Sequence, residues 1–135
     1  MTKVAEIVGG ALALLRIVDA AEAPEAEDVA TGISAMNMMM SRWEANGYSV
    51  GWSPVAAPSD DMPSPPEADE AIMYNLAARL RARYGANLEE DVFGEARRLK
   101  SDVLADVFAA NPMEMERGLP GLRGCYNTRT DGFDC

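Results

Sequence analysis

The stretch from Val29 to Tyr48, VATGISAMNMMMSRWEANGY, decides the fold of this chain. Its large apolar residues recur at steps of three and four, so they lie along one stripe of an α-helix. The stripe consists of Val29, Ile33, Met36, Met40 and Trp43, and Met39 widens it. Asn46-Gly47 supplies the helix stop, because glycine readily adopts the left-handed conformation that a C-cap needs. By itself this pattern indicates an amphipathic core helix.

A first helix is predicted before this stretch. From about Thr2 to Val18, apolar residues follow the helical period, and Thr2 is a reasonable N-cap. Gly9-Gly10 lies inside that helix, where each glycine costs about 1 kcal/mol relative to alanine. We interpret the pair as a close approach between helices. Residues 19–28 follow as an acidic link with five carboxylates and no cation.

Two more helices are predicted after a proline-rich segment. The third helix begins near Glu67 and is stopped by Gly85. The fourth runs from about Leu88 to Ala110, before Asn111-Pro112 ends it. The predicted core residues of the bundle are Ile33, Met36, Met40, Trp43, Ile72, Leu76, Leu80, Val92, Leu99 and Val103.

Three arginines, Arg79, Arg81 and Arg83, cluster in the last turns of the third helix. Cations at that position complement the partial negative charge of a helix C-terminus. Alternatively, they pair with carboxylates on a neighbouring subunit. Both interpretations stay open at the level of sequence.

The pattern changes between Tyr48 and Pro66. Tyr48, Val50 and Trp52 alternate with small residues, which is the period of a short strand. The prolines that follow exclude a regular helix. Two interpretations compete for this segment: a flexible solvent loop, or a hairpin-like arm that pairs with a neighbour or lines a channel.

The last part of the chain, residues 111–135, shows neither helical nor strand periodicity. Its glycines and Pro120 favour an extended arm beyond a helical domain of residues 1–110. A tail that is simply disordered and one that folds on a partner have the same signature. The candidate anchors in this segment are Leu119, Leu122, Tyr126 and Phe133. The fold predicted is therefore mainly α: a small four-helix bundle with a short strand or hairpin-like loop between helices two and three and an extended C-terminal arm.

Composition and charge narrow the function. The 135 residues are 48% hydrophobic and 25% charged, which suits one globular domain with a modest core. The net charge of −10 disfavours DNA binding, because duplex binding relies on Lys and Arg to neutralise phosphates. The acidic surface either serves solubility alone or forms a negative wall that lets DNA slide past.

No residue pattern indicates catalysis. Histidine, the commonest general base and metal ligand, is absent. The chain has no Gly-rich phosphate loop, and Cys125 has no histidine to activate it. Two cysteines alone do not complete a tetrahedral zinc site within one chain. With 22 acidic residues some carboxylate pair is always present, so such pairs carry no weight. We expect no enzyme, no cofactor and no metal.

Targeting signals are also missing from the sequence. Residues 1–18 lack the features of a signal peptide, and no apolar run approaches the ~20 residues of a membrane helix. Cys125 and Cys135 both lie near the C-terminus and do not form a disulfide framework. We therefore expect a protein of a cytosolic compartment with no membrane contact.

The order of these features resembles one family. The helix end MMSRWEANG, residues 39–47, followed by YSVGW, residues 48–52, is similar to head-to-tail adaptor proteins of tailed phages. So are NLAARL, residues 75–80, after the proline-rich loop, and a long fourth helix with Ala96 and Lys100 before a non-helical tail. The family that matches best is the tail accessory factor, or head completion protein, of short-tailed phages. The resemblance covers residues 2–110 in order, whereas Cys125 and Cys135 correspond to no family feature.

The resemblance implies a structural virion protein. Its copies would form a ring, dodecameric in the family, below the portal protein, bind there after DNA packaging and extend the DNA channel. They would help to retain the genome, which passes through without specific binding, and would dock a downstream tail or adaptor protein. The expected location is the head-tail neck of the virion, and the host cytoplasm during assembly. The residues expected to contact the portal or other subunits are Tyr48, Val50, Trp52, Leu119, Leu122, Tyr126 and Phe133.

Two other classes of function stay open. A small acidic helical regulator that binds and inhibits a basic protein would use the same charge without ring symmetry. A peptidoglycan hydrolase would use paired carboxylates. Gene neighbourhood separates the three, because an adaptor gene should follow the portal and capsid genes.

Overall fold

The computed structural model describes residues 1–19, 21–110, 126–127 and 132–133. In these residues the chain forms four α-helices and one pair of two-residue antiparallel strands, in which Tyr126 lies opposite Phe133. The elements are α1 (Val4–Leu14), α2 (Ala26–Ala45), α3 (Pro66–Tyr84), α4 (Glu90–Ala110), β1 (Tyr126–Asn127) and β2 (Gly132–Phe133). The prediction of a mainly α, four-helix fold is confirmed.

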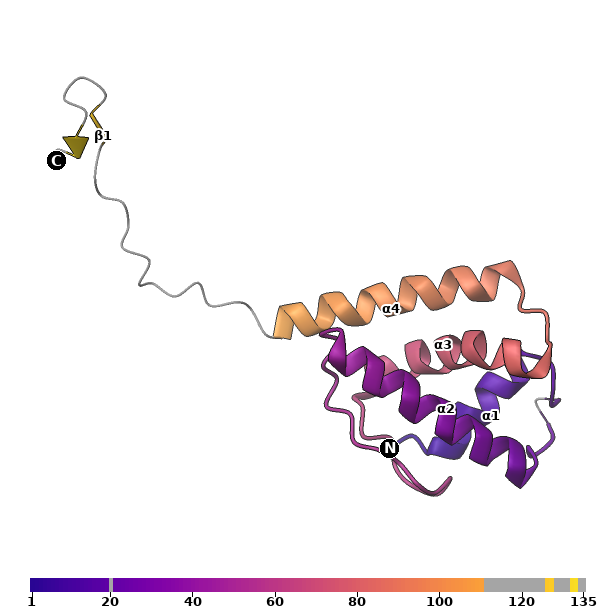
Figure 1. Cartoon of the computed structure of the whole chain (residues 1–135). Coiled ribbons are helices and arrows are strands. Elements are labelled where there is room, and N and C mark those ends of the chain that lie inside the picture. Colours follow the sequence, from indigo (N-terminus) through magenta and orange to yellow (C-terminus); the bar gives the residue numbers. More distant parts are fainter. Residues whose placement is uncertain (20, 111–125, 128–131, 134–135) are drawn as a thin grey trace.

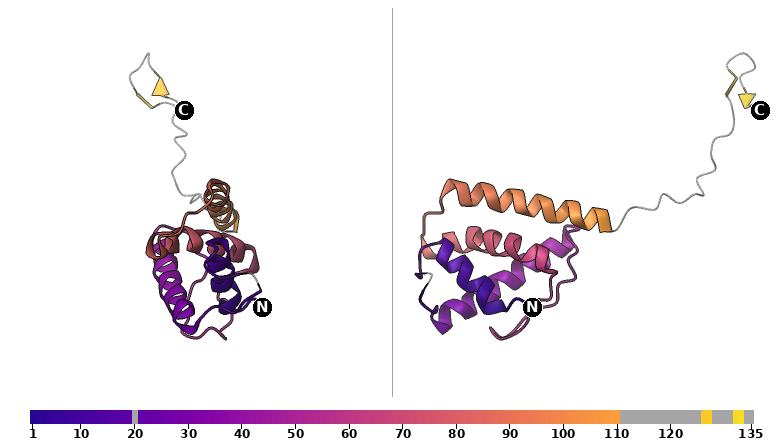
Figure 2. Two further views of the ribbon diagram at one scale, coloured as in Figure 1. Left: turned by 90° about the vertical axis from the view of Figure 1, so that its right-hand side faces the viewer. Right: turned by 180° about the vertical axis from the view of Figure 1, so that it is seen from behind.

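The helix α3 is the centre of the bundle. It contacts α1, α2 and α4, and α1 also contacts α2. In Figures 1 and 2, α1, α2 and α3 enclose a common interior, whereas α4 lies along the outside of α3. The fold is therefore a three-helix core with a fourth helix laid over one side.

The core lies where the apolar stripes of α1, α2 and α3 meet. The predicted core residues of α2 and α3 are all buried: Ile33, Met36, Met40, Trp43, Ile72, Leu76 and Leu80. Val103 of α4 is also buried. Met39 is buried as well, as the width of the stripe predicted. The methionines fill this interior because their unbranched side chains adapt to irregular gaps.

Two predicted core residues of α4 are not buried. Val92 is half-buried and lies outside the core cluster, and Leu99 is half-buried and packs against the edge of that cluster. The reason is that α4 covers α3 from outside and buries only Ala96 and Val103. Its apolar stripe is wider than the strip of α3 available to cover it.

Gly10 allows α1 to approach α3 closely, as predicted for the Gly9-Gly10 pair: a Cβ added to Gly10 would lie 2.3 Å from Sδ of Met73. Gly9 takes no part in this approach, because the nearest atom to its added Cβ is Cγ of Pro24 at 4.0 Å. A second close approach was not apparent from sequence: a Cβ on Gly32 of α2 would lie 2.4 Å from Cγ1 of Val8. Real Cβ atoms do not approach side chains so closely, so Gly32 sets the distance between α1 and α2.

The start of α1 differs from the prediction. Thr2 is not its N-cap; the helix begins after Lys3, and the backbone N–H groups of Val4 and Ala5 donate to the carbonyl oxygens of Asp60 and Pro58, each at 3.0 Å. The loop between α2 and α3 thus satisfies donors that a capping side chain would otherwise satisfy.

The end of α1 also differs. The helix stops at Leu14 rather than Val18, because Arg16 adopts a left-handed conformation with φ 55°. By contrast, α3 ends as predicted, since Gly85 follows it with φ 63°. Among the described residues, no helix combines the length and hydropathy needed to cross a bilayer.

Candidate protein-interaction site

The segment after α2 does not form the predicted strand. Residues 48–65 run as an irregular loop, and the side chain of Glu44 holds its first part. The Glu44 carboxylate accepts hydrogen bonds from the backbone N–H groups of Val50 at 3.1 Å and Trp52 at 3.0 Å. The Ser49 hydroxyl donates to the same carboxylate at 3.2 Å. A carboxylate on the preceding helix thus takes the place of a partner strand.

A second side chain of α2 holds the middle of this loop. The amide of Asn37 donates to the carbonyl of Val55 at 2.8 Å and accepts from its N–H at 3.1 Å. This pair of bonds imitates the exchange between two strand residues. Val55 and Met62 are both buried. The loop therefore contributes to the core.

The far end of the loop is tied to itself and to α1. The Asp60 carboxylate accepts from the N–H groups of Ala57 at 2.8 Å and Ala56 at 3.0 Å, and these bonds lower the pKa of Asp60. Lys3 and Asp61 form a salt bridge of 2.6 Å. The segment is therefore a packed loop rather than a strand or hairpin, and its contact with a neighbour or a channel stays a prediction.

The three interaction residues predicted in this loop gather at the end of α2. The Tyr48 ring lies 5.7 Å from the Trp43 ring, and the ammonium of Lys100 on α4 lies 5.0 Å and 5.3 Å from their centroids. Val50 is buried. Trp52 is half-buried, and in the described structure its indole N–H has no hydrogen-bond partner. These residues are buried or half-buried rather than fully exposed to solvent, so their contact with another protein stays a prediction.

A groove of about 360 Å³ opens beside this aromatic cluster. It combines the loop, the start of α3 and the last turns of α4, and is lined by Ser49, Val50, Pro65, Glu67, Ala68, Val103, Asp106, Val107 and Ala110. We call it the α4 groove. Its walls are mostly apolar, and Glu67 and Asp106 add two carboxylates. Apolar groups with a few polar ones are what a protein-binding groove requires.

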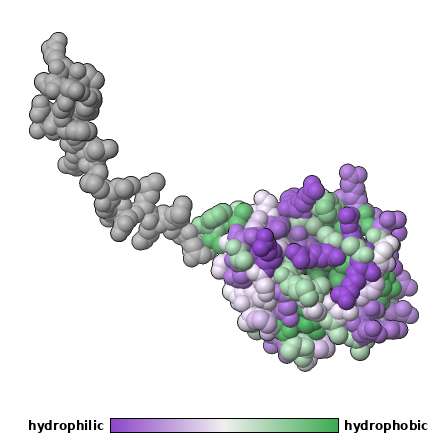
Figure 3. Space-filling view, in the orientation of Figure 1, coloured by the Kyte–Doolittle hydropathy of each residue, from purple (hydrophilic) through white to green (hydrophobic). Residues whose placement is uncertain are grey.

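The end of α4 adds exposed apolar surface next to this groove. Phe108 is 61% exposed although it is a large hydrophobic residue. Figure 3 shows apolar surface where α4 ends. Residues 111–135 continue the chain from Ala110, which itself lines the groove. The groove and the C-terminal segment therefore start at the same place on the molecule.

The four anchors predicted in the C-terminal segment are not placed by the structure. Leu119 and Leu122 lie outside the described residues. Tyr126 and Phe133 belong to β1 and β2, but their side chains are outside the description. Their role as anchors, like the roles of Cys125 and Cys135, stays at the level of sequence.

Sequence reasoning missed most of the groove. Pro65 and Ala68 carry no pattern of their own, because the groove arises only when three distant segments meet. The one available signal is the stripe Val103, Val107 and Ala110, which keeps the helical spacing of four and three residues to the last residue of α4.

The groove is lined mainly by apolar side chains. Among the described residues, no group of three or more Cys, Asp and Glu side chains is arranged to hold a metal ion. The arrangement suits binding by burial of apolar surface.

Comparison with known protein families gives a match over nearly the whole chain. A family model described as the P22 tail accessory factor matches residues 1–131. A search of curated proteins finds no match. The matched range includes all four helices, the packed loop, the α4 groove and nearly all of the C-terminal segment.

Proposed function

We propose that this chain, which belongs to the P22 tail accessory factor family, is the head-to-tail adaptor that binds the portal ring of its phage. Membership of the family makes it a tail-associated structural protein of the virion. In the proposed role, copies of the chain bind the portal after DNA packaging and form a ring in the neck of the virion. The ring extends the DNA channel, helps to retain the genome and gives tail proteins a docking surface.

The observation that carries the proposal is the α4 groove at the root of the C-terminal segment. α4 buries only two of its residues, yet it presents apolar side chains along its last turns. Surface of this kind indicates a protein partner. In the proposal the portal covers the α4 groove, and residues 111–135 lie along the portal from that point.

The charge of the chain fits passage of DNA without binding. The net charge of −10 makes a ring of identical copies repel phosphates along its channel. The family match favours the adaptor over a regulator of a basic protein.

Electron microscopy of the protein mixed with its portal ring tests this function. We expect an added ring of density on one side of the portal and no change when an unrelated acidic helical protein is added. A protein that stays monomeric alone is compatible with the proposal, because a ring can assemble on its template. Portal rings that remain unchanged at saturating protein would refute it.

Removal of residues 112–135 tests the contribution of the C-terminal segment. The truncated chain should keep the helical signal and the melting temperature of the full chain, because every buried residue of the described bundle lies before Ala110. It should bind the portal more weakly, as measured by a pull-down titration with the full chain as reference. Undiminished binding would refute the role of this segment.

A further inference from the structure

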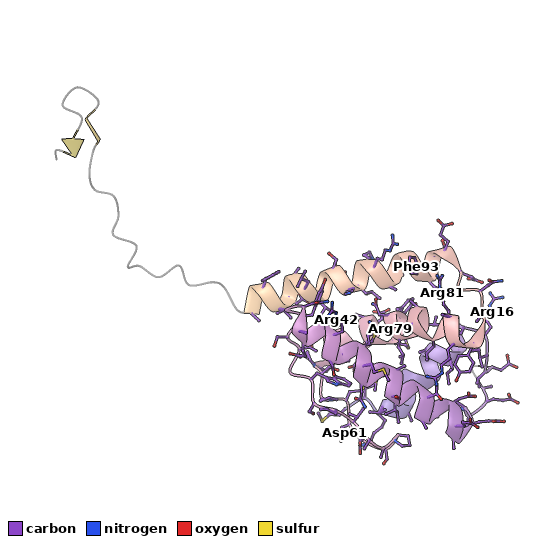
Figure 4. All side chains as sticks on the ribbon, in the orientation of Figure 1. Arg16, Arg42, Asp61, Arg79, Arg81 and Phe93 are labelled. Carbon is purple, nitrogen blue, oxygen red and sulfur yellow. The ribbon has the colours of Figure 1, made fainter. Side chains whose placement is uncertain are left out.

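One side of α2 carries an exposed methionine beside arginines. Met38 is 63% exposed and lines a hollow of about 220 Å³ with Ala35, Arg79, Leu80 and Arg83. Figure 4 shows Arg42 and Arg79 between α2 and α3, while Arg81 lies toward Phe93 of α4. We call the surface of Met38, Arg79 and Arg83 the Met38 face.

The two arginines of this face carry like charges on one helix. Arg79 and Arg83 are four residues apart on α3, a spacing at which like charges destabilise a helix. Within the described part of the chain, neither forms a salt bridge. A surface that combines an exposed apolar side chain with nearby cations is complementary to an apolar groove with an acidic rim.

The other side of α2 carries such a groove. It has a volume of about 480 Å³ and only apolar lining residues, namely Pro24, Ala26, Val29, Ala30, Ile33, Ala56 and Pro58. Glu25 and Glu27 flank Ala26, are exposed, and form no salt bridge among the described residues. We call this surface the Pro58 groove.

The two surfaces do not cover each other within one molecule. At 3.6 residues per turn, Met38 projects from α2 roughly a third of a turn away from Ala26, Ala30 and Ile33. The Met38 face and the Pro58 groove therefore point in different directions. Each needs a partner, and a second copy of the chain supplies the matching surface.

We propose that the Met38 face of one copy docks into the Pro58 groove of the next copy. The proposal rests on the ring of the proposed function and names the surfaces that join its neighbours. The flexible thioether of Met38 enters the apolar groove, and Arg79 and Arg83 meet Glu25 and Glu27 at its rim. When two copies join in this way, one copy keeps a free Met38 face and the other a free Pro58 groove. The contact can therefore repeat from copy to copy until the ring closes.

Charge reversal on each surface tests this contact. We compare wild type with R79E/R83E and with E25R/E27R, measuring self-association by sedimentation velocity and by chemical cross-linking of copies bound to the portal. Each variant alone should associate at least ~10-fold more weakly, because it sets like charges opposite one another. An equal mixture of the two variants should recover wild-type association, since each contact in an alternating assembly is then either native or reversed on both sides.

The control variant is R97E/R98E, which makes the same change of net charge as R79E/R83E but on the outer helix α4, and it should leave association unchanged. Melting temperatures of all variants establish that each is folded. Recovery in the mixture supports the proposal. Wild type that self-associates neither alone nor on the portal, or a mixture that recovers nothing, would overturn it.

The same experiment separates this contact from portal binding. R79E/R83E and E25R/E27R keep the α4 groove, so single copies should still bind the portal while cross-links between copies are lost. Wild type that self-associates as described without binding the portal would refute the proposed function and leave the contact between copies standing.

Discussion

The three-helix core and α4 are built in different ways. α1, α2 and α3 bury long apolar stripes against one another and approach closely at Gly10 and Gly32. α4 buries only Ala96 and Val103, and Leu99 and Val107 pack half-buried against the core. Polar and cation–π contacts add to this attachment. The amide of Asn75 on α3 donates to the carbonyl of Ala96 at 2.8 Å.

Cations make the remaining attachments of α4. The guanidinium groups of Arg81 and Arg97 lie 5.5 Å and 4.5 Å from the Phe93 ring. Lys100 lies over the rings of Trp43 and Tyr48. Such contacts contribute about 0.5–1 kcal/mol each when exposed, whereas a buried leucine contributes several times more. More apolar residues are buried among α1, α2 and α3 than on α4, so most of the stability should reside in the three-helix core. The end of α4 keeps exposed apolar surface that can serve binding.

Truncation of one apolar residue in each region should give the largest change in the free energy of unfolding. Leu76→Ala in α3 should lower the free energy of unfolding by about 2–5 kcal/mol, because Leu76 is fully buried at the centre of the core. Val103→Ala in α4 should cost only about 1–2 kcal/mol, since it removes less buried surface at the edge. Urea unfolding measures both, and equal costs would contradict the division of the bundle.

Two glycines give a test in which the sign differs between the regions. Gly32→Ala should destabilise by about 1–3 kcal/mol, because its Cβ would overlap Val8 and force α1 and α2 apart. Gly94→Ala should instead stabilise by up to about 1 kcal/mol, since nothing lies within 4 Å of its added Cβ and alanine is the better helix former. Thermal melts of the two variants should shift in opposite directions; a shared direction would show that α1–α2 spacing is not fixed at Gly32.

The packed loop of residues 48–65 is a third region to compare, because the Glu44 side chain of α2 holds it by hydrogen bonds. Glu44→Ala leaves the N–H groups of Val50 and Trp52 without their acceptor, which should cost about 1–2 kcal/mol. Hydrogen exchange at these two amides should speed up while α1–α3 stay protected. The matched control is Glu90→Ala in the first turn of α4, where no hydrogen bond to the loop is lost. Unchanged exchange in Glu44→Ala would mean that the carboxylate does not hold the loop.

The smallest expected effect comes from the contact between α3 and the start of α2. The Tyr84 hydroxyl donates to Asp28 at 2.7 Å, and burial together with this bond raises the pKa of Tyr84 to about 12. The folded state thus favours the protonated phenol more strongly than the unfolded chain does, in which the pKa of tyrosine is near 10.0. The stabilisation is complete below about pH 10 and is lost as the pH rises toward 12.

Tyr84→Phe should therefore lower stability by about 1 kcal/mol at neutral pH. The difference between wild type and the variant should shrink between pH 10 and 12, as measured by melting temperature at each pH. A difference that stays constant over this range would show that the phenol does not titrate as described.

The sequence predicted the core better than the surface. Ile33, Met36, Met40 and Trp43 are buried because the helical period, read along one segment, reports directly which face of a helix is covered. Gly85 ends α3 for an equally local reason, since its φ of 63° suits glycine. Local patterns were sufficient wherever the structure depends on neighbours in sequence.

The errors arose where distant residues decide the structure. The alternation of Tyr48, Val50 and Trp52 is a correct local pattern, but a strand needs a partner and Glu44 supplies the acceptor instead. Val92 follows the same stripe as Val103, yet only the latter meets the core. The α4 groove was beyond prediction for the same reason, because its walls come from three segments that only the fold brings together.

The most direct test of the central claim compares two neighbouring alanines at the end of α4. Ala109 and Ala110 are both exposed, but only Ala110 lines the α4 groove. Ala110→Glu and Ala109→Glu add the same charge to the same helix end, so their free energies of unfolding should be alike and close to wild type. In a binding titration with the portal ring, Ala110→Glu should bind at least ~10-fold more weakly, since a buried unpaired charge opposes docking. Ala109→Glu should bind like wild type. Equal portal affinity for the two variants would contradict the assignment of function to the α4 groove.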